Sequence, residues 1–296
     1  MQKKFLSSFY YSSLNIHPML SLYNQTCLEC SSLITRRYST SFSMGIRVFD
    51  KKYRAPIYAI YGFVRFADEI VDTFHDFPKK ELLDKFRKDT YEAIESGISL
   101  NPVLHSFQQV VNSYHIEREL IDAFLDSMEM DLNMNAYEDN LYQKYIYGSA
   151  EVVGLMCLRV FVNGDDLLYK HLYASARSLG SAFQKINFLR DIKSDFDERG
   201  RVYFPGVDFR SFSMNDKLQI ESDIKKDFDH ALTGITQLPQ GVRFGVYLAY
   251  KYYIKLFQKI KSASPSKVKE ERIRVNDSRK VALIFSSAFR LRFNLF

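Results

Sequence analysis

Residues 54–74 read RAPIYAIYGFVRFADEIVDTF, and this stretch decides the fold. Its apolar residues recur at helical spacing on almost every side, which is typical of a helix buried inside a protein. Four polar residues interrupt the apolar pattern, and they are Tyr61, Arg65, Asp68 and Asp72. They stand at positions i, i+4, i+7 and i+11 and therefore lie along one narrow stripe of the helix. A polar stripe on a buried helix must face either solvent or an internal cavity.

Asp68 and Asp72 stand one turn apart on this stripe. Two carboxylates in that arrangement repel each other by roughly 0.2–0.5 kcal/mol, and a divalent cation between them reverses the sign. Mg²⁺ takes oxygen ligands and is commonly held by one or two carboxylates together with substrate phosphates. A D-x-x-x-D pair is also common on solvated helix faces, so the first stripe does not establish a metal site by itself.

A second stripe repeats the pattern in another apolar helix. It contains Gln184, Asn187, Asp191 and Asp195 at positions i, i+3, i+7 and i+11. If the two stripes face each other, four carboxylates converge on one cavity, and burying them without cations would be prohibitively costly. Bound Mg²⁺ and a diphosphate group offset that charge, because the cation stabilises a diphosphate as it leaves.

The two stripes and their flanks resemble the two signatures of squalene and phytoene synthases. The first signature is carried by residues 39–43 (STSFS), 61–65 (YGFVR) and 68–72 (DEIVD). The second is carried by residues 184–195 (QKINFLRDIKSD) and 199–205 (RGRVYFP). The resemblance extends over nearly the whole chain and is greatest to bacterial phytoene synthases.

That family implies an all-α fold, a single-domain isoprenoid-synthase helical bundle with a central cavity. The domain would span residues 19–296, after a disordered tail at residues 1–18. Mg²⁺, with Mn²⁺ as the alternative metal, would be bound by the four aspartates of the stripes. The expected catalytic residues are Asp68, Asp72, Asp191, Asp195 and Arg65. The expected substrate contacts are Ser39, Ser41, Phe42, Tyr61, Tyr145, Gln184, Asn187, Tyr250 and Arg272.

Residues 145–154 resemble the kinked cavity helix of the family, with one departure. Many relatives carry Val-Ala-Gly where this chain has Ser149, Ala150 and Glu151. Within this segment, Tyr145 alone is therefore expected to contact substrate.

The reaction implied by the resemblance joins two prenyl diphosphates head to head through a cyclopropyl diphosphate. Squalene synthases finish with a hydride from NADPH and commonly carry a C-terminal membrane anchor, whereas phytoene synthases finish with proton loss. The chain shows neither a recognisable dinucleotide-binding loop nor a run of about 18 apolar residues. We therefore expect phytoene from two geranylgeranyl diphosphates via prephytoene diphosphate, in carotenoid biosynthesis and without NADPH.

Two alternatives stay open. The first is a C30 synthase of the dehydrosqualene or squalene type, which would use two farnesyl diphosphates. The second is a non-catalytic assembly protein of the same family, which loss of the aspartates would favour. A chain-elongating prenyltransferase or a terpene cyclase more usually has D-D-x-x-D as its first motif, and residues 68–72 read DEIVD.

The amino-acid composition limits which other functions the chain can have. Apolar residues make up 46% and aromatic residues 15% of the 296 positions, which is enough for one large core with an apolar pocket. The net charge is +6, but no dense Lys/Arg block with interleaved aromatic residues occurs, so nucleic acid is not expected as a partner. We expect a cytoplasmic monomer, and docking of residues 281–296 on the inner face of the membrane is a hypothesis.

Helical periodicity runs through almost all of the sequence, and breaks fall at Gly and Pro. Residues 262–267 are expected to form a loop. The predicted helices are 20–36, 39–47, 51–74, 78–96, 100–113, 117–132, 138–163, 166–198, 214–235, 239–262 and 276–292.

Overall fold

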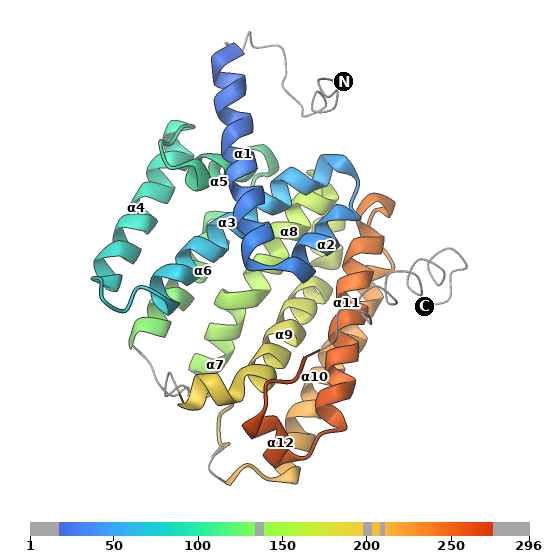
Figure 1. Ribbon diagram of the computed structural model, residues 1–296. Coiled ribbons are helices and arrows are strands. Elements are labelled where there is room, and N and C mark those ends of the chain that lie inside the picture. Colours follow the sequence, from blue (N-terminus) through green and yellow to red (C-terminus); the bar gives the residue numbers. More distant parts are fainter. Residues whose placement is uncertain (1–17, 134–138, 198–202, 208–210, 275–296) are drawn as a thin grey trace.

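Every regular element in the described part of the chain is a helix (Figure 1). The computed structural model describes residues 18–133, 139–197, 203–207 and 211–274. Its elements are α1 (Pro18–Tyr38), α2 (Thr40–Arg47), α3 (Lys51–Asp72), α4 (Lys79–Ser96), α5 (Pro102–Tyr114), α6 (Arg118–Asn133), α7 (Asp139–Ile146), η1 (Tyr147–Glu151), α8 (Val152–Val162), α9 (Asp166–Asp197), α10 (Met214–Ile235), α11 (Gln240–Lys261) and α12 (Pro265–Glu270). The all-α fold predicted from the sequence is confirmed.

The helices form a bundle with α8 and α9 in its middle (Figure 1). Helices α4 and α6 lie along one side, and α10 and α11 lie along the other. On the first side, Phe63 of α3 stacks on Phe107 of α5 with ring centroids 3.9 Å apart. Phe86 of α4 and Phe124 of α6 also contact the Phe63 ring. This aromatic cluster fixes α3 among three other helices.

Helix α3 has the burial that its sequence pattern predicts. Its apolar residues are largely buried, Phe63 and Ala67 completely. The predicted polar stripe is half-buried throughout, at Tyr61, Arg65, Asp68 and Asp72. One narrow side of an otherwise buried helix therefore remains accessible.

The predicted helix 138–163 is interrupted by one π-helical turn. This turn, η1 (Tyr147–Glu151), joins α7 to α8. A Cβ atom at Gly148 would lie 2.3 Å from the carbonyl oxygen of Ala123 on α6. The backbones of η1 and α6 therefore touch, which only glycine permits at this position.

One predicted loop is partly wrong, and two other predicted segments lie outside the residues that the structure describes. The loop predicted at residues 262–267 is wrong in its second half, because α12 begins at Pro265 with Ser264 as its N-cap. The Ser264 hydroxyl accepts a hydrogen bond from the backbone N–H of Lys267 at 3.2 Å. The predicted helix 276–292 and the predicted tail lie outside the described residues, apart from Pro18 at the start of α1.

One stretch of the described chain, Asn140–Val162, is long and apolar enough to cross a membrane by length and composition alone. Its mean hydropathy is 1.4, and 61% of the relevant window is buried inside the protein. A core helix of a bundle passes the same test, and this stretch packs against α6 and α9.

Candidate functional site

An apolar cavity of about 490 Å³ lies between α2, α3, α8, α9 and α11, with η1 and α10 completing its wall. Most of the residues that line it are aliphatic or aromatic, including Phe42, Phe49, Phe161 and Phe183. Such a lining suits a long apolar ligand held by a few polar groups. The polar lining residues come mainly from α3, α9 and α11.

Ser39, Phe42 and Tyr61 form one polar-aromatic corner of the cavity. Ser39 is the N-cap of α2, and its hydroxyl accepts a hydrogen bond from the backbone N–H of Phe42 at 3.2 Å. The Phe42 ring stacks on Tyr61, with centroids 4.8 Å apart. Burial raises the pKa of Tyr61, while a hydrogen bond with Ser39 and the charge of Arg65 oppose that rise. The side chain of Ser41 lies outside the described residues.

Arg65 stands one turn beyond Tyr61 and is paired with acidic neighbours. Its Nη1 donates to Asp68 Oδ2 at 2.7 Å, and its Nη2 donates to Glu69. The guanidinium also lies 4.5 Å from the centre of the Tyr38 ring. The Nε of Arg65 is buried and has no hydrogen-bond partner among the described residues. The guanidinium of Arg65 is thus held beside Asp68 and Glu69.

Gln184, Asn187 and Arg190 of α9 line the opposite wall of the cavity. Asn187 accepts a hydrogen bond from the Tyr253 hydroxyl at 3.2 Å and donates to Gln184 at 3.4 Å. The Tyr253 ring stacks on Phe183 at 3.8 Å between centroids, and burial raises the pKa of Tyr253. Tyr253 of α11 thus packs against the α9 wall of the cavity.

Asp191 is held by two arginines. Arg190 Nε donates to its Oδ1 at 3.0 Å, and Arg272, from the segment after α12, forms an ion pair with Asp191 in which its Nε lies 2.8 Å from Oδ1. Burial by itself lowers the pKa of Arg190, but the hydrogen bond and charge of Asp191 outweigh burial and raise it. Arg190 also lines the cavity, so it links the second aspartate motif to the apolar interior.

The two aspartate motifs stand at the C-terminal ends of their helices. Asp72 is the last residue of α3, and Asp195 is in the last turn of α9. The helix dipole is negative there and disfavours carboxylates, so both places call for cations. Among the described side chains, which exclude Asp195, no three His, Cys, Asp or Glu lie close enough to hold a metal ion. A Mg²⁺ site built from one or two carboxylates and substrate phosphates is compatible with this geometry.

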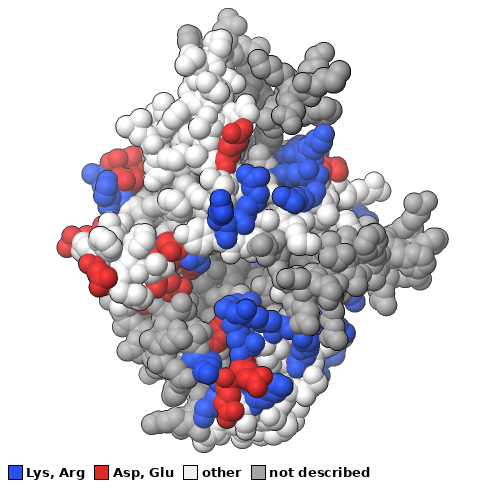
Figure 2. All heavy atoms as spheres, in the orientation of Figure 1, with Lys and Arg blue, Asp and Glu red and all other residues white. Residues whose placement is uncertain are grey.

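Positive charge gathers near the second motif. Figure 2 shows Lys and Arg side chains in the lower middle of this face, over α11 and the segment that follows α12. Helix α11 contains no acidic residue, and its exposed or half-exposed lysines include Lys251, Lys255 and Lys259. A basic surface beside Asp191 and Arg272 would draw an anionic ligand towards the cavity.

Three predicted substrate contacts, Tyr145, Tyr250 and Arg272, do not line this cavity. Tyr145 is buried, donates a hydrogen bond to Asp131 Oδ2 at 2.9 Å and stacks on Tyr203 at 5.4 Å. Tyr250 is buried with its ring edge against Phe228 at 5.5 Å, and burial raises its pKa to about 12. On α11, the tyrosines that line the cavity are Tyr252 and Tyr253, and the sequence prediction named neither of them.

The chain resembles known proteins in sequence. The sequence profile of the squalene/phytoene synthase family matches residues 35–279. Phytoene synthase 1 of Solanum lycopersicum is 26% identical over 264 residues, which is 82% of this chain and 63% of that protein. The 4,4'-diapophytoene synthase of Staphylococcus haemolyticus is 26% identical over 200 residues, which is 66% of this chain and 67% of that protein. The chain thus spans less than two thirds of the length of the plant relative.

Solved structures share the fold. A dehydrosqualene synthase in complex with ligand has a TM-score of 0.78 and 20% identity, covering 92% of this chain and 98% of that one. A squalene synthase from Alicyclobacillus acidocaldarius has a TM-score of 0.71 and 18% identity, covering 81% of this chain and 95% of that one. The isoprenoid-synthase helical fold predicted from the sequence is therefore confirmed.

Proposed function

Because the chain belongs to the squalene/phytoene synthase family, we propose that it joins two geranylgeranyl diphosphates head to head to form phytoene, in carotenoid biosynthesis. One arrangement supports this proposal above all. The same apolar cavity is lined by Tyr61 and Val64, which precede Asp68 on α3, and by Asn187 and Arg190, which precede Asp191 on α9. Two aspartate motifs thus border a cavity that suits two prenyl chains.

The residues of both motifs fit a magnesium site that works with diphosphate. Mg²⁺, or Mn²⁺ in its place, would be held by Asp68, Asp72, Asp191 and Asp195, and would stabilise the charge that develops on the leaving diphosphate. The carboxylates supply only oxygen, which is the ligand that Mg²⁺ prefers. Their position at two helix C-termini gives a physical reason for a cation there.

The cations of the chain would bind and orient the diphosphates. Arg65 lies at Asp68, and Arg190 and Arg272 lie at Asp191. Arginine is suited to this role because its guanidinium contacts phosphate oxygens in a fixed planar geometry. Diphosphate that displaces the carboxylates from these arginines would free the carboxylates for Mg²⁺.

The apolar walls would protect the carbocations. The first C–O bond breaks, the double bond of the second substrate attacks the allylic cation, and loss of a proton closes a cyclopropane. A second ionisation and rearrangement are followed by loss of another proton, which leaves the central double bond of the product. Released diphosphate is our proposed proton acceptor. Water would capture each cation, so an apolar cavity is required, and its aromatic faces contribute roughly 0.5–2 kcal/mol each.

A C30 synthase acting on two farnesyl diphosphates is the second candidate. It is favoured by the similarity to a 4,4'-diapophytoene synthase and by the fold shared with a dehydrosqualene synthase. The chemistry and the proposed residue roles are the same in both candidates. They differ in the length of the chain that the cavity accommodates.

Product analysis separates these candidates. Purified protein receives the C15 and C20 prenyl diphosphates separately, with Mg²⁺ and with or without NADPH, and hydrocarbons are identified by mass. We expect C40 phytoene from the C20 substrate, independent of NADPH and abolished by EDTA. A C30 hydrocarbon from the C15 substrate would keep the mechanism and replace the substrate. Folded protein that forms no hydrocarbon would support the non-catalytic alternative.

A further inference from the structure

The cavity runs along one face of α9. The residues of this helix that line it recur at helical spacing from Leu172 to Arg190, a face that is ~27 Å long at 1.5 Å per residue. Its amide and guanidinium side chains, Gln184, Asn187 and Arg190, lie at the end beside the second aspartate motif. A prenyl chain whose diphosphate lies at the aspartates would therefore extend from Asn187 towards Leu172.

Helix α8 runs alongside α9 and fixes the depth of the lining residues. A Cβ atom at Gly180 would lie 2.7 Å from the oxygen of Ala150 in η1, and one at Gly154 would lie 3.2 Å from the oxygen of Ala176. The two contacts are four residues apart on each side, so α8 and α9 pack antiparallel in a constant register. That register places Phe161, near the end of α8, seven residues or ~10 Å beyond the level of Ala176.

Two aromatic rings close the far end of the cavity. Phe49 and Phe161 both line it and meet edge to face, with ring centroids 5.3 Å apart. Tyr53 also packs against Phe161, with centroids 6.4 Å apart. Phe49 is pressed against α11, because a Cβ atom at Gly245 would lie 2.3 Å from its ring. Rings packed on several sides do not readily move aside, so Phe49 and Phe161 form a fixed end wall.

Ala176 lies between the polar end of the cavity and this end wall. It lines the cavity and is half-buried, and α9 lies in the middle of the bundle (Figure 1). Ala176 shares the lining face of α9 with Leu172 and Leu179, whereas Ala174 is on the opposite side of the helix and is exposed. Between two leucines, a single methyl group leaves the cavity wide at this level.

The depth of Ala176 matches the length difference between the two candidate substrates. Asn187 and Ala176 are eleven residues apart, which is ~16 Å along α9. An extended chain advances ~1.2 Å per bond, so a farnesyl main chain spans ~13 Å and a geranylgeranyl main chain ~18 Å. With its first carbon at Asn187, a farnesyl chain ends before Ala176. A geranylgeranyl chain passes Ala176 and enters the section that ends at Phe161.

We propose that Ala176 is a specificity-determining residue, whose small side chain admits the last isoprene unit of a C20 chain to the section between Ala176 and Phe161. This inference rests on the proposed function and deepens it, because it names the part of the cavity that distinguishes the C20 from the C15 substrate. The last isoprene unit buries apolar surface there that a C15 chain leaves unburied. A larger side chain at this position would exclude that unit by steric clash and leave the aspartate motifs unchanged.

The test compares Ala176→Leu with Ala174→Leu in the full chain. Both variants add the same three carbons to α9, but Ala174 is exposed on the outer side. We expect Ala176→Leu to lose at least about tenfold in kcat/KM for the C20 substrate and to stay within about twofold of the wild type for the C15 substrate. Its main product should then be a C30 hydrocarbon, whereas Ala174→Leu should keep the product of the wild type.

Binding provides a second measurement that does not depend on turnover. The C15 and C20 thiolodiphosphates, which resist ionisation, are titrated into each variant, and melting curves followed by circular dichroism check that each variant folds. Ala176→Leu should bind the C20 analogue about tenfold more weakly and the C15 analogue as the wild type does. Ala176→Val adds less bulk and should show the same preference to a smaller degree, so it replaces Ala176→Leu if that variant does not fold.

Three results would overturn the role of Ala176 and leave the proposed function intact, provided that the wild type forms phytoene. They are unchanged use of the C20 substrate by Ala176→Leu, equal loss of both substrates, and an equal loss of the C20 substrate in Ala174→Leu. A wild type that forms no hydrocarbon from the C20 substrate would overturn both proposals.

Discussion

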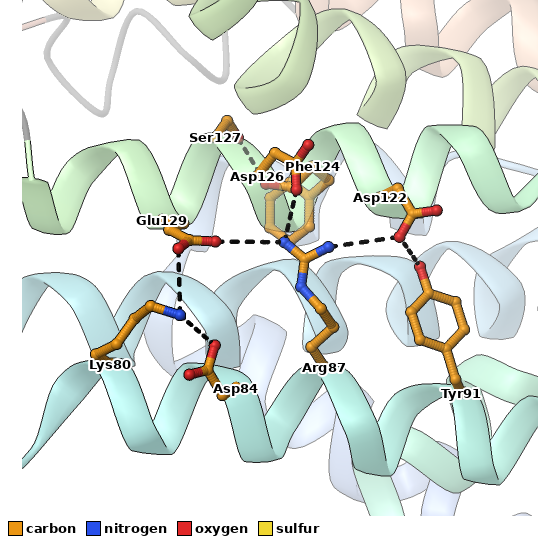
Figure 3. Close-up of polar contacts among 9 residues, drawn as sticks. All are labelled: Lys80, Asp84, Arg87, Tyr91, Asp122, Phe124, Asp126, Ser127 and Glu129. Atoms are coloured by element: carbon orange, nitrogen blue, oxygen red, sulfur yellow. Dashed lines mark hydrogen bonds and ion pairs between the residues drawn. The ribbon is translucent and has the colours of Figure 1, made fainter.

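Arg87 Nη2 on α4 lies 2.7 Å from Asp126 Oδ1 on α6 (Figure 3). The same guanidinium approaches Asp122, and Lys80 approaches Glu129, so α4 supplies cations to the acidic side of α6 (Figure 3). Asp122 and Asp126 form a D-x-x-x-D pair with the same spacing as Asp68 and Asp72. Spacing alone therefore does not define a metal site. The proposed motifs differ because they stand at helix C-termini beside an apolar cavity.

The first prediction uses this third pair as a matched control. Asp68→Asn or Asp191→Asn should reduce hydrocarbon formation by at least about a hundredfold, because the proposed metal site loses a ligand. Asp126→Asn should leave formation near the wild-type rate and lower the free energy of unfolding by about 0.5–1 kcal/mol, since Asp126 is well exposed. Rates with saturating Mg²⁺ and urea titrations measure both effects. Equal loss of activity in Asp126→Asn would contradict the assignment of the motifs.

The second prediction distinguishes Tyr253 from Tyr250, two of the tyrosines of α11. Tyr253→Phe removes the hydroxyl that donates to Asn187 but keeps the stack on Phe183. We expect a loss of about 1 kcal/mol, or roughly fivefold in kcat/KM. Tyr250 does not line the cavity, so Tyr250→Phe should change kcat/KM by much less. A larger loss of kcat/KM in Tyr250→Phe than in Tyr253→Phe would support Tyr250 as the substrate contact, as expected from the sequence.

These tyrosines show where sequence reasoning succeeds and where it stops. The stripe on α3 could be predicted because every other side of that helix is apolar, so its period identifies one face. Helix α11 carries Tyr250, Tyr252 and Tyr253 within one turn, and periodicity cannot choose among them. Only contact with Asn187 distinguishes Tyr253. The family resemblance indicated a kinked helix at residues 145–154, but the π-helical form of the kink depends on how Gly148 meets a distant helix and could not be predicted.

The third prediction concerns the contact between Gly148 and α6. Gly148→Ala places a methyl group against the backbone of α6, which cannot move aside, so the free energy of unfolding should fall by about 1–3 kcal/mol. Gly45→Ala is the matched control, because a Cβ there meets nothing within 4 Å. Alanine is the better helix former, so this variant should gain about 0.5–1 kcal/mol. Urea titrations of both variants measure the difference, and a stable Gly148→Ala protein would show that η1 and α6 can separate.

The last prediction follows from the burial of Glu151. Burial raises its pKa above the ordinary 4.5, although the hydrogen bond from Arg177 opposes the rise. The fold therefore prefers the neutral acid. The stability that this preference contributes is complete below the ordinary pKa and is lost as the pH rises through the higher folded-state pKa.

Glu151→Gln is permanently neutral and can still accept a hydrogen bond from Arg177. Its melting temperature should match the wild type near pH 4 and exceed it increasingly as the pH rises towards 7. Taking the difference between the two proteins at each pH cancels the titration of the other carboxylates. If the melting temperature of the wild type instead rises relative to that of Glu151→Gln as the pH increases, the charged pair of Glu151 and Arg177 stabilises the turn by more than the burial of Glu151 costs.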